Sequence, residues 1–373
     1  MKYYIIAGEA SGDLHGSNLM KGILQADPDA NFRYLGGDKM QSQGGKLVKH
    51  YREMALMGIG MVILKFRTIT RNISFCKRDI KEFQPDVVIL IDLAGFNLKV
   101  GRYVKKLGIR VFYYISPKVW AWNSSRVKTI KEVVDKMFVI FPFEVGFYKE
   151  HDYEVEYYGN PLLDAITDKK NEPDARPAFA ERNNLSNKPV IAVLPGSRKQ
   201  EIDLCLPEMM AVIPDFTGYQ FVIAGAPGID PDYYNKFISS RDVPILYEQT
   251  YDLLKYAEAA IVTSGTATLE TALMDVPEVV CYKAGKFTYH VGKHFVKPKF
   301  FSLVNIIMDK EIVKELLQFN LARDISGELN RILNDSSYRD SMLEHFAGLR
   351  ETLGAPGASY RLGQRIFDLI CES

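Results

Sequence analysis

MKYYIIAGEASGDLHG, residues 1–16, is the stretch that decides the fold. An apolar, β-rich run over residues 3–7 ends at Gly8, and a helical pattern follows over residues 12–24. Glycine after a first strand lets the chain turn tightly into a helix and lets a ligand approach the backbone. The stretch therefore predicts a strand that feeds a helix, which is the first half of a βαβ unit, rather than a signal peptide.

The same alternation continues outward along the chain. Apolar β-rich runs at residues 87–92, 110–115 and 136–140 alternate with helical patterns at 97–107 and 125–134. A polar segment at 164–189 is expected to be a linker, and the pattern then restarts with runs at 190–194, 221–224, 244–246, 260–263 and 279–282. Strands that alternate with helices predict an α/β protein with two successive parallel sheets of the Rossmann type.

The end of the chain has a helical period. Apolar residues recur at spacings of three and four between residues 340 and 373, at Met342, Phe346, Leu349, Leu362, Ile366 and Leu369. We therefore predict a first domain over residues 1–165, a second over 166–340, and a helical segment over 341–373 that packs across the domain boundary.

Composition excludes several classes of protein. The 373 residues are 47% hydrophobic and 25% charged, which is ordinary for a folded protein and argues against long disorder. A formal net charge of +1 argues against a general nucleic-acid-binding protein. The four cysteines form no CxxC pair, so we expect no zinc site and a reducing compartment. No apolar stretch approaches the length of a membrane span, and the expected location is cytoplasmic.

Polar residues gather where the first strand ends. Glu9, Ser11, Asp13 and His15 follow the apolar run within a few positions. Open α/β sheets bind ligands at the carboxyl ends of their strands, so these side chains are candidate site residues. The alternative is a plain strand-to-helix turn.

A carboxylate ends another buried run. Asp92 follows the apolar residues 87–91 and begins the segment that continues through Gly95 to Asn97. A carboxylate at this edge of a sheet is placed to take a proton from an attacking hydroxyl. Capping of the next helix is the alternative, but Asn97 is better placed as that cap, which leaves Asp92 for catalysis.

Both tryptophans of the chain, Trp120 and Trp122, lie in the segment SPKVWAW, residues 116–122. Residues two apart share a face only if the segment is extended, in which case the two rings could stack on a sugar or line an acyl groove. Packing in the core is the alternative.

Two further stretches suit a lipid or membrane surface. Residues 54–66, MALMGIGMVILKF, are apolar, rich in methionine and followed by basic residues, which fits either buried core or a patch that contacts a membrane. Residues 283–299 interleave lysines with aromatic residues, which fits an anionic lipid, a sugar phosphate or a solvated loop. His290 and His294 in that stretch lack a carboxylate at a helpful spacing, so no metal site is predicted.

The second half of the chain holds turns suited to phosphate. Residues 195–198, Pro-Gly-Ser-Arg, and residues 263–270, TSGTATLE, each lead into a predicted helix. A helix N-terminus offers free N–H groups and the positive end of a dipole, and Arg198 can add a charge-assisted bond to a diphosphate. Glu270 could accept hydrogen bonds from ribose hydroxyls. There is no GKS/T motif, which disfavours an ATPase.

Together these motifs resemble the lipid-A-disaccharide synthase family of bacterial glycosyltransferases, which have the GT-B architecture. The resemblance is carried in family order by GEASGD (8–13), GGDKM (36–40), Met57-Gly58, DLAGFN (92–97), SPKVWAW (116–122), FPFE (141–144), LPGSR (194–198) with Glu201, SGTATLE (264–270), SLVN (302–305) and VKELLQ (313–318). GEASGD and the WAW segment are the more specific motifs.

The resemblance implies a GT-B fold, with two Rossmann-like domains, an interdomain cleft and a C-terminal helical segment. It implies transfer from UDP-2,3-diacylglucosamine to 2,3-diacylglucosamine 1-phosphate (lipid X), with inversion and no metal or other cofactor. The composition of residues 54–66 predicts peripheral association with the cytoplasmic face of the inner membrane, and a homodimer is a further possibility.

The resemblance also assigns residue roles. UDP would be bound by Ser197, Arg198, Glu201, Ser264, Gly265, Thr266, Thr268 and Glu270, and the acceptor or its acyl chains by Ser11, His15, Trp120, Trp122 and Asn305. Many members have an acidic residue where Gly95 stands here, so Asp92 is the predicted general base, with Asp13 and Glu9 as alternatives. The competing functions are another GT-B enzyme of UDP-GlcNAc, such as a peptidoglycan N-acetylglucosaminyltransferase or an epimerase, and a membrane-associated protein that binds nucleotide sugars without turnover.

Overall fold

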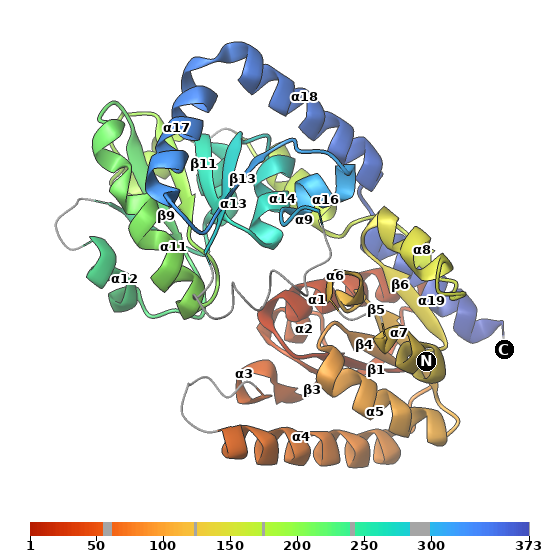
Figure 1. The fold of residues 1–373 in the computed structure, drawn as a ribbon. Coiled ribbons are helices and arrows are strands. Elements are labelled where there is room, and N and C mark those ends of the chain that lie inside the picture. The colour runs from red at the N-terminus through yellow and green to blue at the C-terminus, as the bar shows by residue number, and fades with distance from the viewer. Residues whose placement is uncertain (55–61, 123–124, 174–175, 239–242, 284–298, 373) are drawn as a thin grey trace. The chain divides into compact units, whose positions relative to one another are not determined.

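A computed structural model describes residues 1–54, 62–122, 125–173, 176–238, 243–283 and 299–372, apart from the side chains of residues 62–67, 121 and 122. The chain forms two compact units (Figure 1). Unit 1 contains Met1–Asp164 and Ala355–Ser373, and unit 2 contains Ala165–Gly354. The chain therefore passes between the units twice, at 164/165 within one helix and again at 354/355.

Unit 1 is built on a parallel sheet. Among the described residues its strands are ordered β3-β2-β1-β4-β5-β6-β7. They are β1 (Lys2–Ala7), β2 (Asn31–Gly36), β3 (Lys46–His50), β4 (Val87–Ile91), β5 (Arg110–Tyr114), β6 (Lys136–Val139) and β7 (Glu156–Tyr157). β1 and β4 are apolar at nearly every position because helices cover both faces of this sheet.

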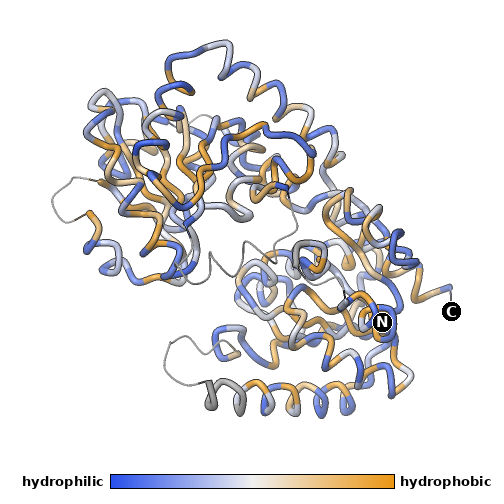
Figure 2. Tube along the Cα trace, in the orientation of Figure 1, coloured by the Kyte–Doolittle hydropathy of each residue, from blue (hydrophilic) through white to orange (hydrophobic). Residues whose placement is uncertain are grey.

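Helices bury each face of the first sheet. On one face α1 and α19 pack over alternate residues of β1 and β4, and on the other α4, α5 and α7 pack over the residues between them. The helices of this unit are α1 (Ala10–Ala26), α2 (Asp38–Gln41), α3 (Tyr51–Met54), α4 (Val62–Phe83), α5 (Ala94–Lys106), α6 (Val119–Trp122), α7 (Arg126–Val133), α8 (Pro142–Lys149) and α19 (Ala358–Cys371). In Figure 2 the apolar colour runs through the strands, whereas the outer helices alternate in colour.

Unit 2 repeats the scheme. Its described strands are all parallel and ordered β10-β9-β8-β11-β12-β13. They are β8 (Val190–Leu194), β9 (Gln220–Gly225), β10 (Ile245–Tyr247), β11 (Ala257–Thr263), β12 (Glu278–Tyr282) and β13 (Lys314–Leu317). The helices are α10 (Arg176–Arg182), α11 (Lys199–Ala211), the 3-10 turn η1 (Ile213–Asp215), α12 (Pro231–Ile238), α13 (Thr250–Lys255), α14 (Thr266–Leu273), α16 (Leu303–Met308), α17 (Leu321–Asn334) and α18 (Ser336–Leu353).

The polar segment expected as a linker at 164–189 is largely helical. It contains the end of α9 (Leu162–Asn171), which crosses from unit 1 to unit 2, and it contains α10. Salt bridges hold α9 on unit 2, from Lys169 to Asp252 and from Lys170 to Asp275. These ion pairs attach the polar segment to unit 2, whose first residue, Ala165, lies at the start of the predicted linker.

The predicted helical tail is confirmed, and it is divided between the units. The apolar residues Met342, Phe346 and Leu349 of α18 are buried in unit 2, whereas Leu362 and Ile366 of α19 are buried in unit 1. Asp335 caps α18 by accepting a hydrogen bond from the N–H of Tyr338 at 3.0 Å. Across the described ranges no helix has both the length and the apolar character that a transmembrane span requires.

Candidate functional site

The first group of candidate residues lies where the strand order of unit 1 reverses. β1 and β4 are neighbours, with Ala7 paired to Ile91, yet the chain leaves them toward opposite sides of the sheet. The loops that follow these strands contain Glu9 and Asp92. Ligands of open parallel sheets bind beyond the carboxyl ends of the strands at such a reversal, so the fold brings these two predicted loops to a favoured position.

Asp92 has an unusual backbone. Its φ is 47° and that of Leu93 is 44°, so two consecutive residues with side chains adopt the left-handed region. The Nδ2 of Asn97 donates to the carbonyl oxygens of Ile91 at 3.0 Å and of Asp92 at 2.8 Å, and the Tyr113 hydroxyl also donates to the Asp92 carbonyl. Strain of this kind persists only where surrounding contacts enforce it, and it is typical of functional sites.

The role predicted for Asn97 as a helix cap was wrong. α5 already begins at Ala94, and Asn97 lies within its first turn. Its buried side chain instead bonds backward to the carbonyls of the Asp92 turn. Asn97 and Tyr113 thus support the turn that carries Asp92.

The loops after β1 and β4 are packed closely together. A Cβ added to Gly8 would lie 2.2 Å from Cδ2 of Leu93, so no side chain fits at position 8 unless Leu93 moves. This close approach is the physical reason for glycine directly after β1. The position of the Glu9 loop is therefore coupled to the turn that carries Asp92.

The surroundings of Asp92 favour a proton acceptor. Its side chain is exposed, but neighbouring protein atoms displace enough water to raise the pKa of the carboxyl above its ordinary value. The N–H of Leu93 and the positive charge of Lys118 oppose this rise. A carboxylate with a raised pKa is a better base, and exposure leaves it accessible to a substrate hydroxyl.

Of the alternative bases, Asp13 has its oxygens engaged. Oδ1 accepts hydrogen bonds from the N–H groups of Gly37 at 2.7 Å and Met40 at 3.0 Å, and Oδ2 accepts from Lys39 at 3.0 Å. These contacts anchor the start of α2 to α1, which gives the carboxylate a structural role. Glu9 is exposed immediately before α1 and remains the more accessible alternative.

The predicted acceptor-binding residues of α1 differ in exposure. Ser11 is exposed at the first turn, whereas His15 is buried. Burial lowers the pKa of His15 to about 4, so the ring is neutral at pH 7. Its Nδ1 is buried and has no hydrogen-bond partner among the described residues.

The tryptophan segment is helical rather than extended. Val119–Trp122 forms the short helix α6, so the condition under which Trp120 and Trp122 would share a face is not met. Trp120 is half-buried and meets the ring of Phe143 edge-on at 5.0 Å. The side chain of Trp122 lies outside the described part, so its predicted role stays a prediction.

The second group of candidate residues lies at the matching reversal in unit 2. β8 and β11 are adjacent, with Leu194 paired to Val262, and the strand order reverses between them. The turn that follows β8 contains Ser197 and Arg198, and the turn that follows β11 contains Ser264 and Gly265. Turns that the sequence places 66 positions apart, 198 to 264, thus emerge from neighbouring strands.

The turn after β8 depends on Gly196 and Glu201. Gly196 has a φ of 105°, and a Cβ there would lie 2.6 Å from Oε2 of Glu201. That oxygen accepts hydrogen bonds from the N–H of Ser197 at 2.9 Å and of Arg198 at 3.2 Å. Glu201 therefore holds the turn, and the exposed Ser197 and Arg198 side chains are free to contact a ligand.

The turn after β11 leads into α14. The Ser264 hydroxyl donates to the carbonyl of Phe301 at 2.9 Å, and the buried Thr268 hydroxyl donates to that of Gly265, also at 2.9 Å. Glu270 accepts a hydrogen bond from the Tyr251 hydroxyl at 2.7 Å, and burial raises the pKa of its carboxyl. Ser264, Thr268 and Tyr251 thus fix this turn, while Thr266 at the first position of α14 is exposed.

Asn305 has an internal set of bonds. Its Oδ1 accepts from the N–H of Ile312 at 2.7 Å and Val313 at 3.1 Å, and its Nδ2 donates to the Val313 carbonyl and to Glu315, both at 2.9 Å. The side chain is fully buried and joins α16 to β13. Its predicted contact with the acceptor stays a prediction, but these bonds give it a structural role.

Some predicted regions lie outside the described residues. Residues 55–61 and 284–298, which include His290 and His294, are not described, and neither are the side chains of 62–67. The membrane-contact and lipid-contact interpretations of 54–66 and 283–299 therefore stay predictions.

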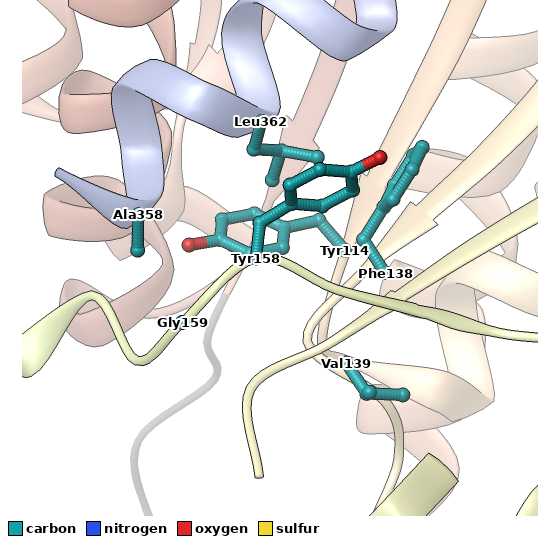
Figure 3. A pocket seen from close by; sticks show the side chains of 7 residues that line it. All are labelled: Tyr114, Phe138, Val139, Tyr158, Gly159, Ala358 and Leu362. Carbon is teal, nitrogen blue, oxygen red and sulfur yellow. The ribbon is translucent and has the colours of Figure 1, made fainter. Parts of the chain in front are cut away.

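None of the predicted site residues lines the pocket in Figure 3. Side chains from β5, β6 and α19 surround it, together with Tyr158, but it leaves about 0 Å³ for a water-sized sphere. It is a narrow gap in the packing of α19 against the sheet. The loops that carry Glu9 and Asp92, and the turns that carry Arg198 and Ser264, follow the carboxyl ends of their strands.

Comparisons with known proteins show which family the chain is similar to. The sequence model of the lipid-A-disaccharide synthetase family matches residues 3–346. Lipid-A-disaccharide synthase of Myxococcus xanthus is 37% identical over 374 residues, which is 98% of this chain and 97% of the relative. The enzyme of the same name from Coxiella burnetii is 34% identical and covers 98% of both chains.

Two solved structures with low sequence identity show which fold the chain shares. UDP-GlcNAc 2-epimerase from Neisseria meningitidis, bound to UDP-GlcNAc, has a TM-score of 0.68 at 13% identity, over 99% of this chain and 100% of that one. The glycosyltransferase of kitacinnamycin has a TM-score of 0.64 at 14% identity, over 99% of both chains. The fold is thus of the two-domain α/β GT-B kind, and the family match and the relatives of similar length show that the chain belongs to the lipid-A-disaccharide synthetase family.

Proposed function

We propose that the chain transfers 2,3-diacylglucosamine from its UDP derivative to 2,3-diacylglucosamine 1-phosphate and releases UDP. The observation that carries the proposal is the family match from residue 3 to residue 346. The placement of the candidate residues at the strand reversals of both sheets supports it, because each unit then offers one substrate site.

The proposed chemistry is a direct displacement. The acceptor hydroxyl attacks the anomeric carbon, the bond from that carbon to the diphosphate oxygen breaks, and the configuration inverts. The hydroxyl proton passes to Asp92, and the electron pair of the broken bond leaves with UDP. The transition state resembles an oxocarbenium ion, as in other glycosyl transfers.

The proposed UDP site uses the turns of unit 2. The N–H groups at the starts of α11 and α14 and the side chain of Arg198 would stabilise the negative charge that develops on the diphosphate. Ser197, Thr266 and Glu270 are proposed to contact the nucleotide, while Glu201, Ser264 and Thr268 hold the turns. No metal or other cofactor is part of this proposal.

The acyl chains of both substrates make a membrane surface a natural partner. We propose that residues 54–66 contact the inner membrane peripherally, on the evidence of their composition. Replacing Met61, Ile63 and Leu64 with serine should lower sedimentation with phospholipid vesicles while the fold is kept, as judged by circular dichroism. Unfolding of this variant would instead assign the segment to the core.

The function is tested with purified protein and both diacylated substrates. Disaccharide 1-phosphate and UDP should form in equal amounts, and excess EDTA should leave the rate unchanged. UDP-GlcNAc offered alone tests the competing enzyme classes, because an epimerase would convert it without an acceptor. Failure to form disaccharide from the diacylated pair would refute the proposal.

A further inference from the structure

The segment VKELLQF, residues 313–319, has no part in the chemistry proposed above. It contains β13, the edge strand of the unit 2 sheet, and the turn that leads into α17 (Figure 1). At the end of this strand two apolar side chains face solvent, because Leu317 is 39% exposed and Phe319 is 65% exposed. In the described part of unit 2 no other large apolar side chain is as exposed as these two.

The turn that carries Phe319 is anchored on both sides. Gln318 extends the sheet by donating its N–H to the Tyr282 carbonyl at 3.1 Å. After the turn, the N–H of Ala322 in α17 donates to the Glu208 carboxylate of α11 at 3.3 Å. The phenyl ring of Phe319 is therefore presented to solvent from a fixed base.

The backbone of this turn is also strained. Gln318 has a φ of 63° and Asn320 a φ of 53°, so both neighbours of Phe319 lie in the left-handed region. Glutamine seldom adopts this conformation, and strain of this kind persists only where surrounding contacts enforce it. Exposed apolar side chains on a strained and anchored turn are typical of a binding surface.

The exposed side chains continue a row of apolar residues that begins at the proposed UDP site. The Ser264 hydroxyl, in the turn after β11, donates to the Phe301 carbonyl at 2.9 Å. The Phe301 ring stacks on that of Tyr282 with centroids 6.0 Å apart, and Tyr282 pairs with Leu317 between β12 and β13. Glu315 fixes Phe301 by accepting from its N–H at 2.9 Å. We call Tyr282, Phe301, Leu317 and Phe319 the apolar edge.

The apolar edge lies on the one apolar side of the proposed UDP site. β11, β12 and β13 are neighbours, and strands lie about 4.8 Å apart, so β13 ends about 10 Å from β11. The other side, after β9, is polar: Asp203 accepts from Lys236 at 2.8 Å and from the Tyr233 hydroxyl at 2.5 Å. Of these two sides, only the β13 side offers exposed apolar side chains in the described part of the unit.

The small size of the apolar edge limits what it can bind. A stable protein interface buries roughly 800 Å² on each partner, which two exposed side chains do not provide. A single hydrocarbon chain needs no more than a short row of apolar contacts. The donor of the proposed reaction has two such chains on the sugar that follows the diphosphate.

We propose that the apolar edge binds an acyl chain of the donor and thereby favours a diacylated UDP-sugar over UDP-GlcNAc. Leu317 and Phe319 contact the chain, whereas Tyr282, Phe301 and Glu315 hold the edge in line with the UDP turn. The free energy comes from burial of apolar surface, and no bond forms or breaks. This inference rests on the proposed function, because the acyl chains belong to the substrate proposed there.

The first test measures binding without turnover. Calorimetry compares UDP with UDP-2,3-diacylglucosamine bearing short acyl chains, in the absence of acceptor. The parent protein should bind the donor more tightly than UDP. Phe319→Ser should weaken donor binding by about tenfold, which corresponds to a loss of roughly 55 Å² of buried apolar surface, and should leave UDP affinity unchanged. An equal loss for UDP and donor, or no loss for either, would overturn the proposal.

Further variants separate acyl binding from folding. Phe319→Leu keeps an apolar side chain and should retain most of the donor affinity, whereas equal losses for Phe319→Leu and Phe319→Ser would contradict an acyl contact. Leu107→Ser, in unit 1, changes a leucine that is 37% exposed, and this matched control should keep both affinities of the parent. If Phe319→Ser does not fold, Leu317→Ser replaces it with the same expected loss.

The reaction provides the second readout. In Phe319→Ser the KM for the donor should rise about tenfold while kcat stays within about threefold, as expected when a contact made equally in the ground and transition states is lost. Lower sedimentation with phospholipid vesicles at unchanged donor affinity would assign the edge to a membrane surface and overturn the proposal. Absence of disaccharide from the parent would refute the proposed function, whereas parent turnover with an unchanged donor KM in the variant would refute the acyl contact alone.

Discussion

At the scale of single residues, the backbone of Asp92 makes asparagine the right replacement for it. Asparagine tolerates the left-handed conformation that this position adopts, and it keeps the size of the side chain while losing the ability to take a proton. Asp92→Asn should therefore leave the turn intact and lower kcat by about 10²–10⁴-fold, as loss of a general base does. Disaccharide formation at saturating donor and acceptor measures this.

The affinity for UDP separates catalysis from structure in this variant. Because the nucleotide is proposed to bind unit 2, calorimetry should give the same UDP affinity for Asp92→Asn as for the parent. A rate within about threefold of the parent would move the role of base to Glu9, which is exposed on the adjoining loop, since general-base loss costs far more than that. A joint loss of rate and UDP binding would mark Asp92 as structural.

Another carboxyl, that of Glu278, predicts how stability depends on pH. It is fully buried at the start of β12, and neither Oε1 nor Oε2 has a hydrogen-bond partner within the described ranges. Burial raises its pKa well above the ordinary value. The pKa in the folded state thus exceeds the value of about 4.3 in the unfolded state. Because of this group, the unfolding free energy falls as the pH rises from about 4.3 to the pKa of the folded state.

Replacing Glu278 with methionine tests this predicted fall of stability with rising pH. The change removes an unsatisfied buried group, which costs about 1–3 kcal/mol, and keeps a similar volume. Urea unfolding at pH 5 and pH 8 should show Glu278→Met to be the more stable protein, with the larger gain at pH 8. An equal gain at both values would mean that the carboxyl is ionised in the folded protein throughout this range, so that its pKa is not raised.

At the scale of elements, the turn between β8 and α11 predicts the contribution of Arg198. Glu201 fixes the backbone of this turn, and the Arg198 side chain is 77% exposed and 3.6 Å from Glu201, so its truncation should leave the turn in place. Arg198→Ala should weaken UDP binding by about 1.5–3 kcal/mol, the value of a hydrogen bond to a charged group. Calorimetry with UDP measures the loss, and unchanged affinity would remove Arg198 from the site.

The packing of α19 on α1 gives a prediction about stability. A Cβ on Gly363 would lie 2.3 Å from the backbone of Gly22, so the two helices meet at their glycines. Gly363→Val should lower the unfolding free energy by about 1–3 kcal/mol or more through overpacking. Gly327→Ala in α17, where a Cβ meets nothing within 4 Å, is the control and should stabilise the protein by roughly 0.5–1 kcal/mol. Equal changes in melting temperature for Gly363→Val and Gly327→Ala would show that the close contact between α1 and α19 does not contribute to stability.

The elements that the sequence predicts well are those buried on both sides. The run 190–194 matches β8, and the runs at 3–7 and 87–92 match β1 and β4 within a residue, because central parallel strands are apolar at every position. β3, with the sequence KLVKH, and β13, with KELL, are edge strands of intermediate burial, and each has only two consecutive apolar residues, which is too short a run to predict a strand. Polar edge strands avoid aggregation and for that reason are hard to predict from sequence.

The site was predictable to the level of loops but not of contacts. Polar residues after apolar runs indicated the loops that carry Asp92 and Arg198, since the carboxyl ends of parallel strands meet at one edge. The bonds of Asp13 to the start of α2 join residues more than twenty positions apart, and those of Asn305 to Glu315 of β13 cross a turn, so no helical or strand period predicts either set. The left-handed backbone of Leu93 was equally hidden, because leucine does not favour it.

At the scale of the whole molecule, the chain passes twice between the units, and this predicts that the two units differ in their ability to fold alone. Unit 2 is one continuous segment, residues 165–354, and contains both turns proposed to bind UDP. It should fold when expressed alone and bind UDP as the full chain does, as judged by circular dichroism and calorimetry. A fragment that folds but does not bind would place part of the nucleotide site in unit 1.

Unit 1 is discontinuous, and its final helix completes its core. Residues 1–164 alone would expose the face of α1, with Leu19 and Ile23, that α19 covers. The Asp164 carboxylate accepts hydrogen bonds from the N–H groups of Gly357 and Ser359, so the two ends of unit 1 lie together. A short Gly-Ser linker from residue 164 to residue 355 should therefore close the unit without strain. We expect the joined protein to unfold cooperatively and at a higher temperature than residues 1–164 alone. Equal melting temperatures for the two proteins would show that α19 contributes nothing to the stability of this domain, against the burial of its apolar face.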